Sequence, residues 1–283
     1  MKHMSASPSS PHVPPVESGR HALVVGANKL IGSEICRHLA RFGAKITLVV
    51  RHNLAAAQGI ADEIQRNGGT AQVLATDVTN PEVFGAMLDK AEATFGPVDY
   101  LVNNAGAFHA GTLLDTTSEM WDDLFRVNAK GVFISATVTV RRNLSADHPL
   151  SIVNIAGASA ERSFPGGSVY AQSKAAVISL TKQMALEWGP YGIRVNAVSP
   201  GPIRLADSAW QADEPELARE VARLPIRRAG TPYEVAAATA FLLGSEAGYI
   251  TGQILAVDGG SLLTWYITRG DNNDQPHSEV PQI

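Results

Sequence analysis

Residues 151–187, SIVNIAGASAERSFPGGSVYAQSKAAVISLTKQMALE, form the stretch around which the rest of the chain is arranged. They predict a buried strand over 151–155, a loop rich in Gly, Ser and Pro, and a long helix that begins near Ser168. Tyr170 and Lys174 are four residues apart, so a helix presents both side chains on one face. An ammonium group beside a phenol favours the phenolate and lowers its pKa, as proton transfer near neutral pH requires. The pair alone fits an ordinary surface helix equally well, so its meaning depends on the flanking sequence.

The composition restricts the class of protein. The 283 residues are 45% hydrophobic and 18% charged with a net charge of -4, which suits one sizeable α/β domain and offers no basic surface for nucleic acid or an anionic membrane. Cys36 is the only cysteine, so no internal disulfide can form and a reducing, cytoplasmic location is expected. No apolar run is long enough to span a membrane, and the eight histidines show no metal-ligand spacing. We therefore expect a cytoplasmic protein without a metal whose partner is a small molecule.

The chain divides into three segments. Residues 1–19 are rich in Ser and Pro and are expected to be a flexible leader, residues 20–267 form one domain, and residues 268–283 form a polar tail. From residue 20 onward apolar strand patterns alternate with helical patterns, and the expected strands are 21–26, 45–50, 71–75, 99–102, 151–155, 194–199 and 254–257. This alternation predicts an α/β fold, a doubly wound, Rossmann-like parallel sheet flanked by helices on both faces. Residues 202–228 have mixed polarity and are expected to form a substrate lid.

Residues 25–32, VGANKLIG, link the first strand to a helix. A glycine turn at this place lets the pyrophosphate of a dinucleotide approach backbone amides at the positive end of the helix dipole. With only two glycines, Gly26 and Gly32, the loop also fits an ordinary strand–helix turn. At the end of the second strand, where a carboxylate would bind the ribose hydroxyls of NAD(H), the chain has Arg51, and Lys29 is a second cation. These charges favour NADP(H) over NAD(H), although solvated surface charges would leave the same pattern.

Seven pieces of sequence in order resemble the short-chain dehydrogenase/reductase family, in its single-domain branch, over roughly residues 20–261. They are VGANKLIG (25–32), Asp77-Val78, NNAG (103–106), Asn128, YAQSK (170–174), NAVSPG (196–201) and YITGQILAVDGG (249–260). The resemblance implies a cofactor bound across the carboxyl ends of the parallel strands. It also implies that Tyr170 is the proton donor, that Lys174 lowers its pKa and holds the nicotinamide ribose, and that Asn128 anchors a water.

The same resemblance assigns the binding residues. Those expected to bind the cofactor are Gly26, Asn28, Lys29, Leu30, Ile31, Gly32, Arg51, Asp77, Val78, Asn104, Ala105, Gly106, Tyr170, Lys174, Pro200, Gly201 and Ile203. Those expected to contact the substrate are Gly157, Ser159, Phe108, His109 and Phe164, with Trp210 on a bordering segment. The aromatic residues suggest an apolar, aromatic or polycyclic substrate, and His109 is expected as a polar wall.

The sequence departs from the family where the family places a catalytic serine, thirteen residues before the tyrosine. That position holds Gly157, and losing one such hydrogen-bond donor typically costs ~2.7–4 kcal/mol of transition-state stabilisation. Ser159 is expected to be the reserve catalytic hydroxyl, and the substrate, a water or a backbone N–H are alternatives. Val25 and Leu30 in the glycine loop and Leu205 after the sixth strand also depart from the family pattern.

The resemblance implies an NADP(H)-dependent oxidoreductase that moves a hydride between nicotinamide and a carbonyl or alcohol, or a related C=N or C=C bond. An alternative is an enzyme of specialised metabolism that uses Tyr170 and Lys174 for elimination, isomerisation or cyclisation. A third possibility, a non-catalytic NADP-binding or assembly subunit, is disfavoured because Tyr170, Lys174 and Asn128 are all present. Helix 171–186 is apolar on more than one face, so a homodimer or homotetramer is expected.

Overall fold

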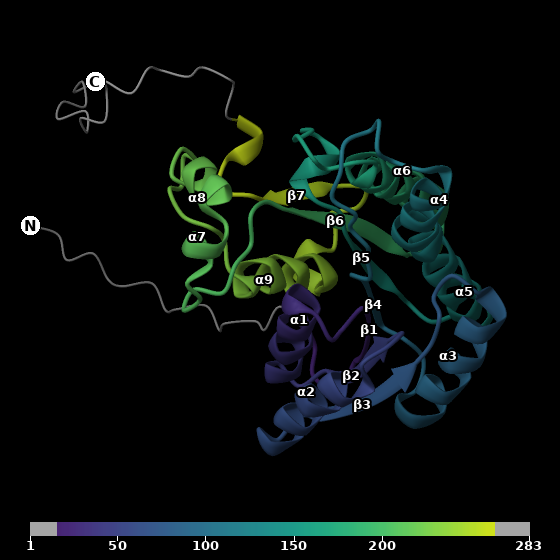
Figure 1. The fold of residues 1–283 in the computed structure, drawn as a ribbon. Helices are drawn as coiled ribbons and strands as arrows, with labels where there is room; N and C mark the ends of the chain where they lie inside the picture. Colours follow the sequence, from purple (N-terminus) through teal and green to yellow (C-terminus); the bar gives the residue numbers. More distant parts are fainter. Residues whose placement is uncertain (1–15, 264–283) are drawn as a thin grey trace, which may run out of the picture.

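The structure is a computed structural model that describes residues 16–263. Its core is one parallel sheet of seven strands in the order β3-β2-β1-β4-β5-β6-β7 (Figure 1). The strands are β1 His21–Val25, β2 Lys45–Val50, β3 Thr70–Ala75, β4 Tyr100–Asn103, β5 Ser151–Ile155, β6 Arg194–Pro200 and β7 Ile254–Val257. The predicted doubly wound α/β fold is confirmed, and every predicted strand is present with small differences at its ends.

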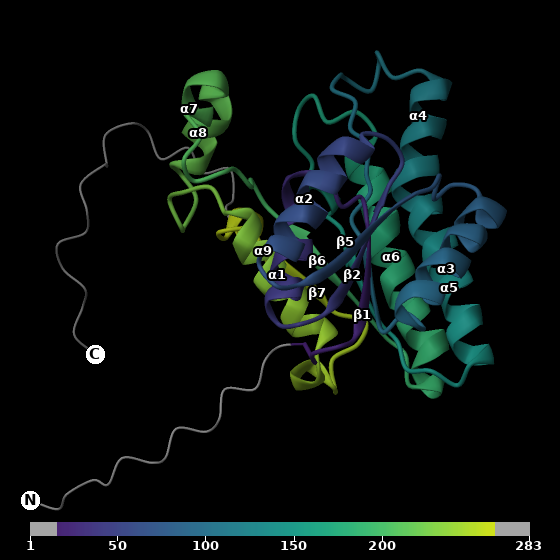
Figure 2. The ribbon, with the colours of Figure 1, turned by 90° about the horizontal axis from the view of Figure 1, so that it is seen from below.

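Helices cover both faces of the sheet, which explains why the central strands are continuous apolar runs rather than alternating ones (Figures 1 and 2). One face carries α1 Leu30–Arg41, α2 Leu54–Arg66 and α9 Pro232–Leu243. The other face carries α3 Pro81–Phe95, α5 Gly131–Ser145 and α6 Tyr170–Trp188. From β1 the chain first adds strands on one side, β2 and β3, and then on the other side, starting with β4. Open parallel sheets bind ligands beyond the carboxyl ends of the strands at this switch point between β1 and β4.

The sequence of residues 118–144 predicts one long helix before β5, but the structure shows that this helix is not continuous. It consists of α4 Ser118–Phe125, a π-helical turn η1 Arg126–Lys130, and α5. The turn contains Asn128, and single π-helical turns inside α-helices are frequent at functional sites. The widened turn follows from tertiary contacts of the Asn128 side chain, described below, which a local helical pattern does not reveal.

The predicted lid contains two short helices, α7 Trp210–Asp213 and α8 Pro215–Val221, which stand apart from the main layers in Figure 2. The sequence of residues 215–224 predicts one helix, and the structure ends it at Val221. A small apolar cluster of Trp210, Val221 and Leu224 holds these helices together. The guanidinium of Arg204 bonds both carboxylate oxygens of Glu214, so the segment has its own internal contacts.

The ends of the chain lie mostly outside the described residues, including the predicted tail and residues 1–15 of the predicted leader. Val16 is fully buried in the core, so packing begins before the predicted boundary at residue 20. In the part of the chain that the structure describes, no helix combines the length and hydrophobicity needed to cross a bilayer.

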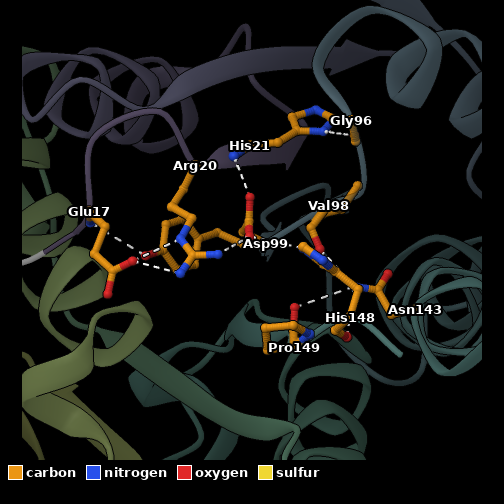
Figure 3. A network of polar contacts seen from close by, with 10 residues as sticks. Glu17, Arg20, His21, Gly96, Val98, Asp99, Asn143, His148 and Pro149 are labelled. Carbon is orange, nitrogen blue, oxygen red and sulfur yellow. Dashed lines mark hydrogen bonds and ion pairs between the residues drawn. The ribbon is translucent and has the colours of Figure 1, made fainter. Parts of the chain in front are cut away.

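Asp99 organises a polar network at the amino ends of the strands, opposite the ligand-binding edge (Figure 3). Its carboxylate accepts hydrogen bonds from the backbone N–H of His21 at 2.7 Å, from Arg20 at 2.9 Å and from the His148 ring at 2.9 Å. Arg20 also contacts Glu17. The network ties the incoming chain to the first residue of β1 and serves the fold rather than the site.

Candidate active site

Tyr170 and Lys174 lie at the start of α6, beside the carboxyl end of β5. The Lys174 ammonium lies 5.9 Å from the centre of the Tyr170 ring and donates a 2.8 Å hydrogen bond to the backbone carbonyl of Ile155. Lys174 is only 4% exposed, and this burial lowers its pKa to about 8. Tyr170 and Lys174 therefore lie close together as predicted, and the lysine hydrogen bond connects α6 to β5.

Burial raises the pKa of Tyr170, so the net shift of this pKa is upward and not downward as expected from Lys174. The reason is that burial disfavours the phenolate, while the lysine ammonium is directed at a backbone carbonyl. At neutral pH the phenol holds its proton, which is the form needed to donate a proton to a substrate oxygen.

Asn128 connects the π-helical turn to the NNAG loop and to α6. Its side-chain oxygen accepts a 2.7 Å hydrogen bond from the backbone N–H of Ala107, and its amide donates to the Ala107 carbonyl at 3.0 Å and to the Ser173 hydroxyl at 2.9 Å. Ser173 in turn donates to the Tyr170 carbonyl at 2.7 Å. Ser173 was missed at the sequence level, where its only signal is its place between Tyr170 and Lys174. The water predicted at Asn128 stays a prediction.

The glycine loop and the NNAG loop form one cradle, although 78 residues separate their contacts. The side-chain amide of Asn104 donates to the carbonyl of Gly26 at 2.8 Å. Gly26 has a φ of +82°, and a Cβ atom on it would lie 2.6 Å from the backbone nitrogen of Ala105. A Cβ on Gly32 would clash with the Gly26 carbonyl. Only glycine fits at either position, because the glycine loop and the NNAG loop are in direct contact there.

The first turn of α1 supplies the other half of this cradle. Its N-cap residue, Lys29, makes no side-chain capping bond, and the first turn has no acidic residue. The first amides, at Leu30, Ile31 and Gly32, therefore lack the side-chain partner that usually caps a helix. Uncapped amides at the start of a helix that follows a glycine turn fit the pyrophosphate of a nicotinamide dinucleotide.

The two cations predicted to distinguish NADP(H) make separate contacts. Arg51 lies 3.4 Å from the Asp77 carboxylate and is half-exposed, whereas the Lys29 ammonium lies 3.4 Å from the Gly106 carbonyl. Asn28 donates to the backbone carbonyl of His52, next to Arg51. Arg51 is thus at the adenosine end of the predicted cradle, and Lys29 reaches toward the end that holds Tyr170.

The remaining predicted cofactor residues line the same edge of the sheet. Val78 is buried, and a Cβ on Gly131 would touch it at 3.1 Å, so it supports the π-helical turn from below. Gly106 faces the site, since a Cβ there would lie 3.4 Å from the Asn128 oxygen and 3.6 Å from the Lys174 ammonium. Pro200 ends β6, and Gly201 lies so close to Asp258 that a Cβ would come within 2.7 Å of its backbone. Ile203 pairs with Gly230 at the base of the lid.

Two of the predicted substrate residues, Phe108 and Phe164, lie close to Tyr170 or to each other. Phe108 packs edge to face against Tyr170 with ring centres 5.2 Å apart and lies roughly parallel to Phe164 at 6.4 Å. Both phenylalanines are about half-exposed. His109 lies 3.4 Å from Asp123 at the edge of this wall. Trp210 is buried in the lid cluster, so its predicted place beside the pocket is not observed.

Gly157 and Ser159 both lie next to Tyr170 in space. A Cβ on Gly157 would be 3.9 Å from the Tyr170 hydroxyl oxygen and 3.3 Å from the Ser159 hydroxyl oxygen. The turn that carries Ser159, η2 Ala158–Ala160, packs against α6. The structure thus brings together the tyrosine, the glycine and the serine that the sequence singled out.

This fold, with a tyrosine–lysine pair at the open end of a dinucleotide cradle, defines a class of nicotinamide-dependent enzymes. Residues 26–261 match the protein-family profile described as enoyl-(acyl carrier protein) reductase, and the chain belongs to the short-chain dehydrogenase/reductase family. It is therefore an oxidoreductase of this family, whose members act on alcohol and carbonyl groups with NAD(H) or NADP(H).

Individual relatives match along nearly their whole length. The inactive 2-(S)-hydroxypropyl-CoM dehydrogenase 2 of Xanthobacter autotrophicus is 38% identical over 80% of this chain and 98% of its own. The 3-oxoacyl-(acyl carrier protein) reductase of Vibrio cholerae is 37% identical over 86% of this chain and 97% of its own. A solved short-chain dehydrogenase/reductase from Mycobacterium marinum superposes with a TM-score of 0.81 at 32% identity, covering 88% of this chain and 98% of the other.

Proposed function

We propose that the protein is an NADP(H)-dependent oxidoreductase that interconverts a ketone or aldehyde and the corresponding alcohol on a small apolar, ring-containing substrate. The observation that carries this proposal is the neutral, partly buried phenol of Tyr170, which packs against Phe108 and has a protonated Lys174 one helical turn away. Relatives named for ketone reduction and alcohol oxidation support the reaction class. Reduction of a related C=N or C=C bond uses the same groups.

The residues of the chain perform the proton half of the reaction. When bound, the nicotinamide ring supplies or accepts the hydride. In the reduction direction the Tyr170 O–H bond breaks as its proton passes to the substrate oxygen, and in oxidation the phenolate takes that proton back. Lys174, with its pKa near 8, carries positive charge at neutral pH and stabilises the transient phenolate. Asn128 and Ser173 hold the first turn of α6 in place through their hydrogen bonds.

The preference for NADP(H) is part of the same proposal. Arg51 follows the buried strand end at Val50, and its guanidinium is exposed enough to meet a 2′-phosphate. The strand ends in Val50 and not in a carboxylate residue that would bind the two ribose hydroxyls of NAD(H). A cytoplasmic location also belongs to this proposal, because a chain with the single cysteine Cys36 forms no internal disulfide and therefore suits a reducing compartment.

A panel of aromatic and alicyclic ketones, aldehydes and alcohols tests the proposal, with each of the four nicotinamide cofactors and the nicotinamide absorbance as readout. We expect turnover that is fastest with NADPH or NADP⁺ and is abolished by Tyr170→Phe. Conversion of a compound without any change in nicotinamide absorbance would instead indicate non-redox acid–base chemistry. Absence of turnover with every member of the panel would contradict the proposed function.

A further inference from the structure

The turn after β5 places a hydroxyl group beside the missing side chain of Gly157. Gly157 is extended, with φ 166° and ψ 144°, so a serine there would suffer no backbone strain. A Cβ on Gly157 would lie 3.9 Å from the Tyr170 hydroxyl oxygen, and a hydroxyl group one bond further out could reach that oxygen. The space beside Gly157 is therefore within reach of the Tyr170 hydroxyl.

The Ser159 hydroxyl lies beside the same space. The backbone N–H of Ala160 donates to the Gly157 carbonyl at 2.8 Å, which closes the tight turn η2 and brings the chain back over Gly157. As a result the Ser159 hydroxyl oxygen lies 3.3 Å from where the Cβ of residue 157 would be. The hydroxyl group comes from two residues further along the chain and lies beside the space that a side chain on residue 157 would occupy.

The Ser159 hydroxyl is also uncommitted. Among the hydrogen bonds of residues 16–263 none involves it, whereas Ser173 and Ser168, which also lie near Tyr170, are bonded to Asn128 and Thr116. Ser159 is partly buried rather than fully solvated. A half-buried hydroxyl without an internal partner can donate a hydrogen bond to a bound ligand without first breaking another one.

We propose that Ser159 donates a hydrogen bond to the substrate oxygen next to Tyr170, in place of a hydroxyl at position 157. The inference rests on the proposed function and adds a residue to it. As hydride reaches the carbonyl carbon, negative charge grows on the oxygen, which receives the Tyr170 proton while Ser159 keeps its own proton and donates only a hydrogen bond. Preorganised donors of this kind act on the charge that develops in the transition state.

Three variants test the inference: Ser159→Ala, Gly157→Ser and the double variant. With the best ketone of the panel and saturating cofactor, Ser159→Ala should lower kcat roughly 10²-fold with little change in KM. Adding Gly157→Ser to Ser159→Ala should restore most of the loss, because the new hydroxyl then has room. Gly157→Ser alone should gain little, because its Cβ would press on the Ser159 oxygen at 3.3 Å. Ser163→Ala, an exposed serine in the same loop, is the control and should change nothing.

A measurement on the free protein separates this inference from the proposed function. Ser159 makes no hydrogen bond to Tyr170 in the structure, so Ser159→Ala should leave the pKa of Tyr170 unchanged while kcat falls, as expected if Ser159 acts on the substrate oxygen and not on the tyrosine. Ultraviolet difference titration against Tyr170→Phe reads this pKa without turnover. Full activity in Ser159→Ala would overturn the inference alone, and so would a raised Tyr170 pKa that accompanies the loss of activity, because the effect would then act through the tyrosine. If Gly157→Ser raised kcat equally with and without Ser159, the serine position would be truly vacant and Ser159 would have no part in catalysis.

Discussion

At the scale of single residues, Lys174 shows a conflict between stability and function. Its pKa falls from 10.5 to about 8 because it is buried, so at neutral pH the folded protein carries a charge that it would hold more easily when unfolded. A group whose folded pKa is lowered in this way destabilises the fold below pH 8. That penalty is progressively relieved between pH 8 and 10.5 as the lysine becomes neutral in the folded state. The penalty, by this shift, is at most ~3 kcal/mol at neutral pH.

We therefore expect Lys174→Met to abolish turnover while leaving the protein at least as stable as wild type at pH 7. Urea unfolding at pH 7 and pH 9.5 measures this, and the advantage of the variant should shrink at the higher pH. Lys182→Met, on the exposed side of the same helix, should change neither stability nor its pH dependence. A variant that is less stable than wild type by the same amount at both pH values would contradict the argument, and would assign the dominant effect to the lost hydrogen bond with Ile155.

Arg51 is the residue on which the cofactor preference depends. A charge-assisted bond to a 2′-phosphate is worth about 1.5–3 kcal/mol, so Arg51→Asp should weaken NADPH binding roughly 10- to 100-fold and narrow or reverse the preference over NADH. Dissociation constants from quenching of protein fluorescence provide the measurement. Arg41→Asp, on the far end of α1, serves as the control because it lies away from the cradle. Equal affinity of the wild type for NADPH and NADH would rule out the assignment.

At the scale of elements, a buried chain of hydrogen bonds joins α5 to α6, two helices on the same face of the sheet, through strands β4 and β5. Ser135 donates to Asn103 at 2.6 Å, Asn103 donates to Asn154 at 2.9 Å, and Asn154 donates to Thr181 at 2.9 Å. All four side chains are almost completely buried. The two asparagines are register partners on β4 and β5, so the chain fixes both strands directly beneath the site. Groups buried this deeply are costly to leave without partners.

A double-mutant cycle tests this chain. Asn154→Leu should destabilise the protein by about 2–4 kcal/mol because it leaves the buried Asn103 amide N–H without an acceptor and removes the hydrogen bond that Thr181 accepts. Asn103→Leu combined with Asn154→Leu should cost clearly less than the sum of the single changes, with a coupling of about 1 kcal/mol or more. Free energies of unfolding from urea titrations give the coupling. Strict additivity would show that the asparagines do not act as a unit.

At the scale of the whole molecule, we propose that the protein is a homodimer or homotetramer that buries α5 and α6. Leu186 on α6 is 74% exposed and Phe133 on α5 is 48% exposed, and both helices already pack their opposite sides against the sheet. Large apolar side chains on a well-formed helix favour a second burial partner, and a two-fold axis lets the same patch cover itself.

Light scattering should therefore give a multiple of the 30.0 kDa chain mass at micromolar concentration. Leu186→Asp should shift the protein toward monomer, whereas Leu114→Asp, at a fully exposed loop position, should leave the mass unchanged. A monomeric wild type at this concentration would contradict the proposal.

The sequence by itself determined the features that depend on local pattern. Continuous apolar runs separated by amphipathic segments specify buried parallel strands and covering helices, because both faces of such a sheet are removed from water. The spacing of Tyr170 and Lys174 specifies a shared face because helical geometry is the same in every protein. The glycine loop, the NNAG loop and Gly157 are likewise recognisable from residue type and spacing alone.

Only the tertiary structure decided which distant groups meet and what burial does to them. The π-helical turn at Asn128 depends on contacts with Ala107 and Ser173, which no local pattern encodes. The tyrosine pKa rises instead of falling because desolvation is set by everything packed around the ring. The Ser159 hydroxyl lies 3.3 Å from where a Cβ on Gly157 would be, because the turn η2 folds back on itself. Distance and burial are properties of the folded chain, and a sequence read along its length contains neither.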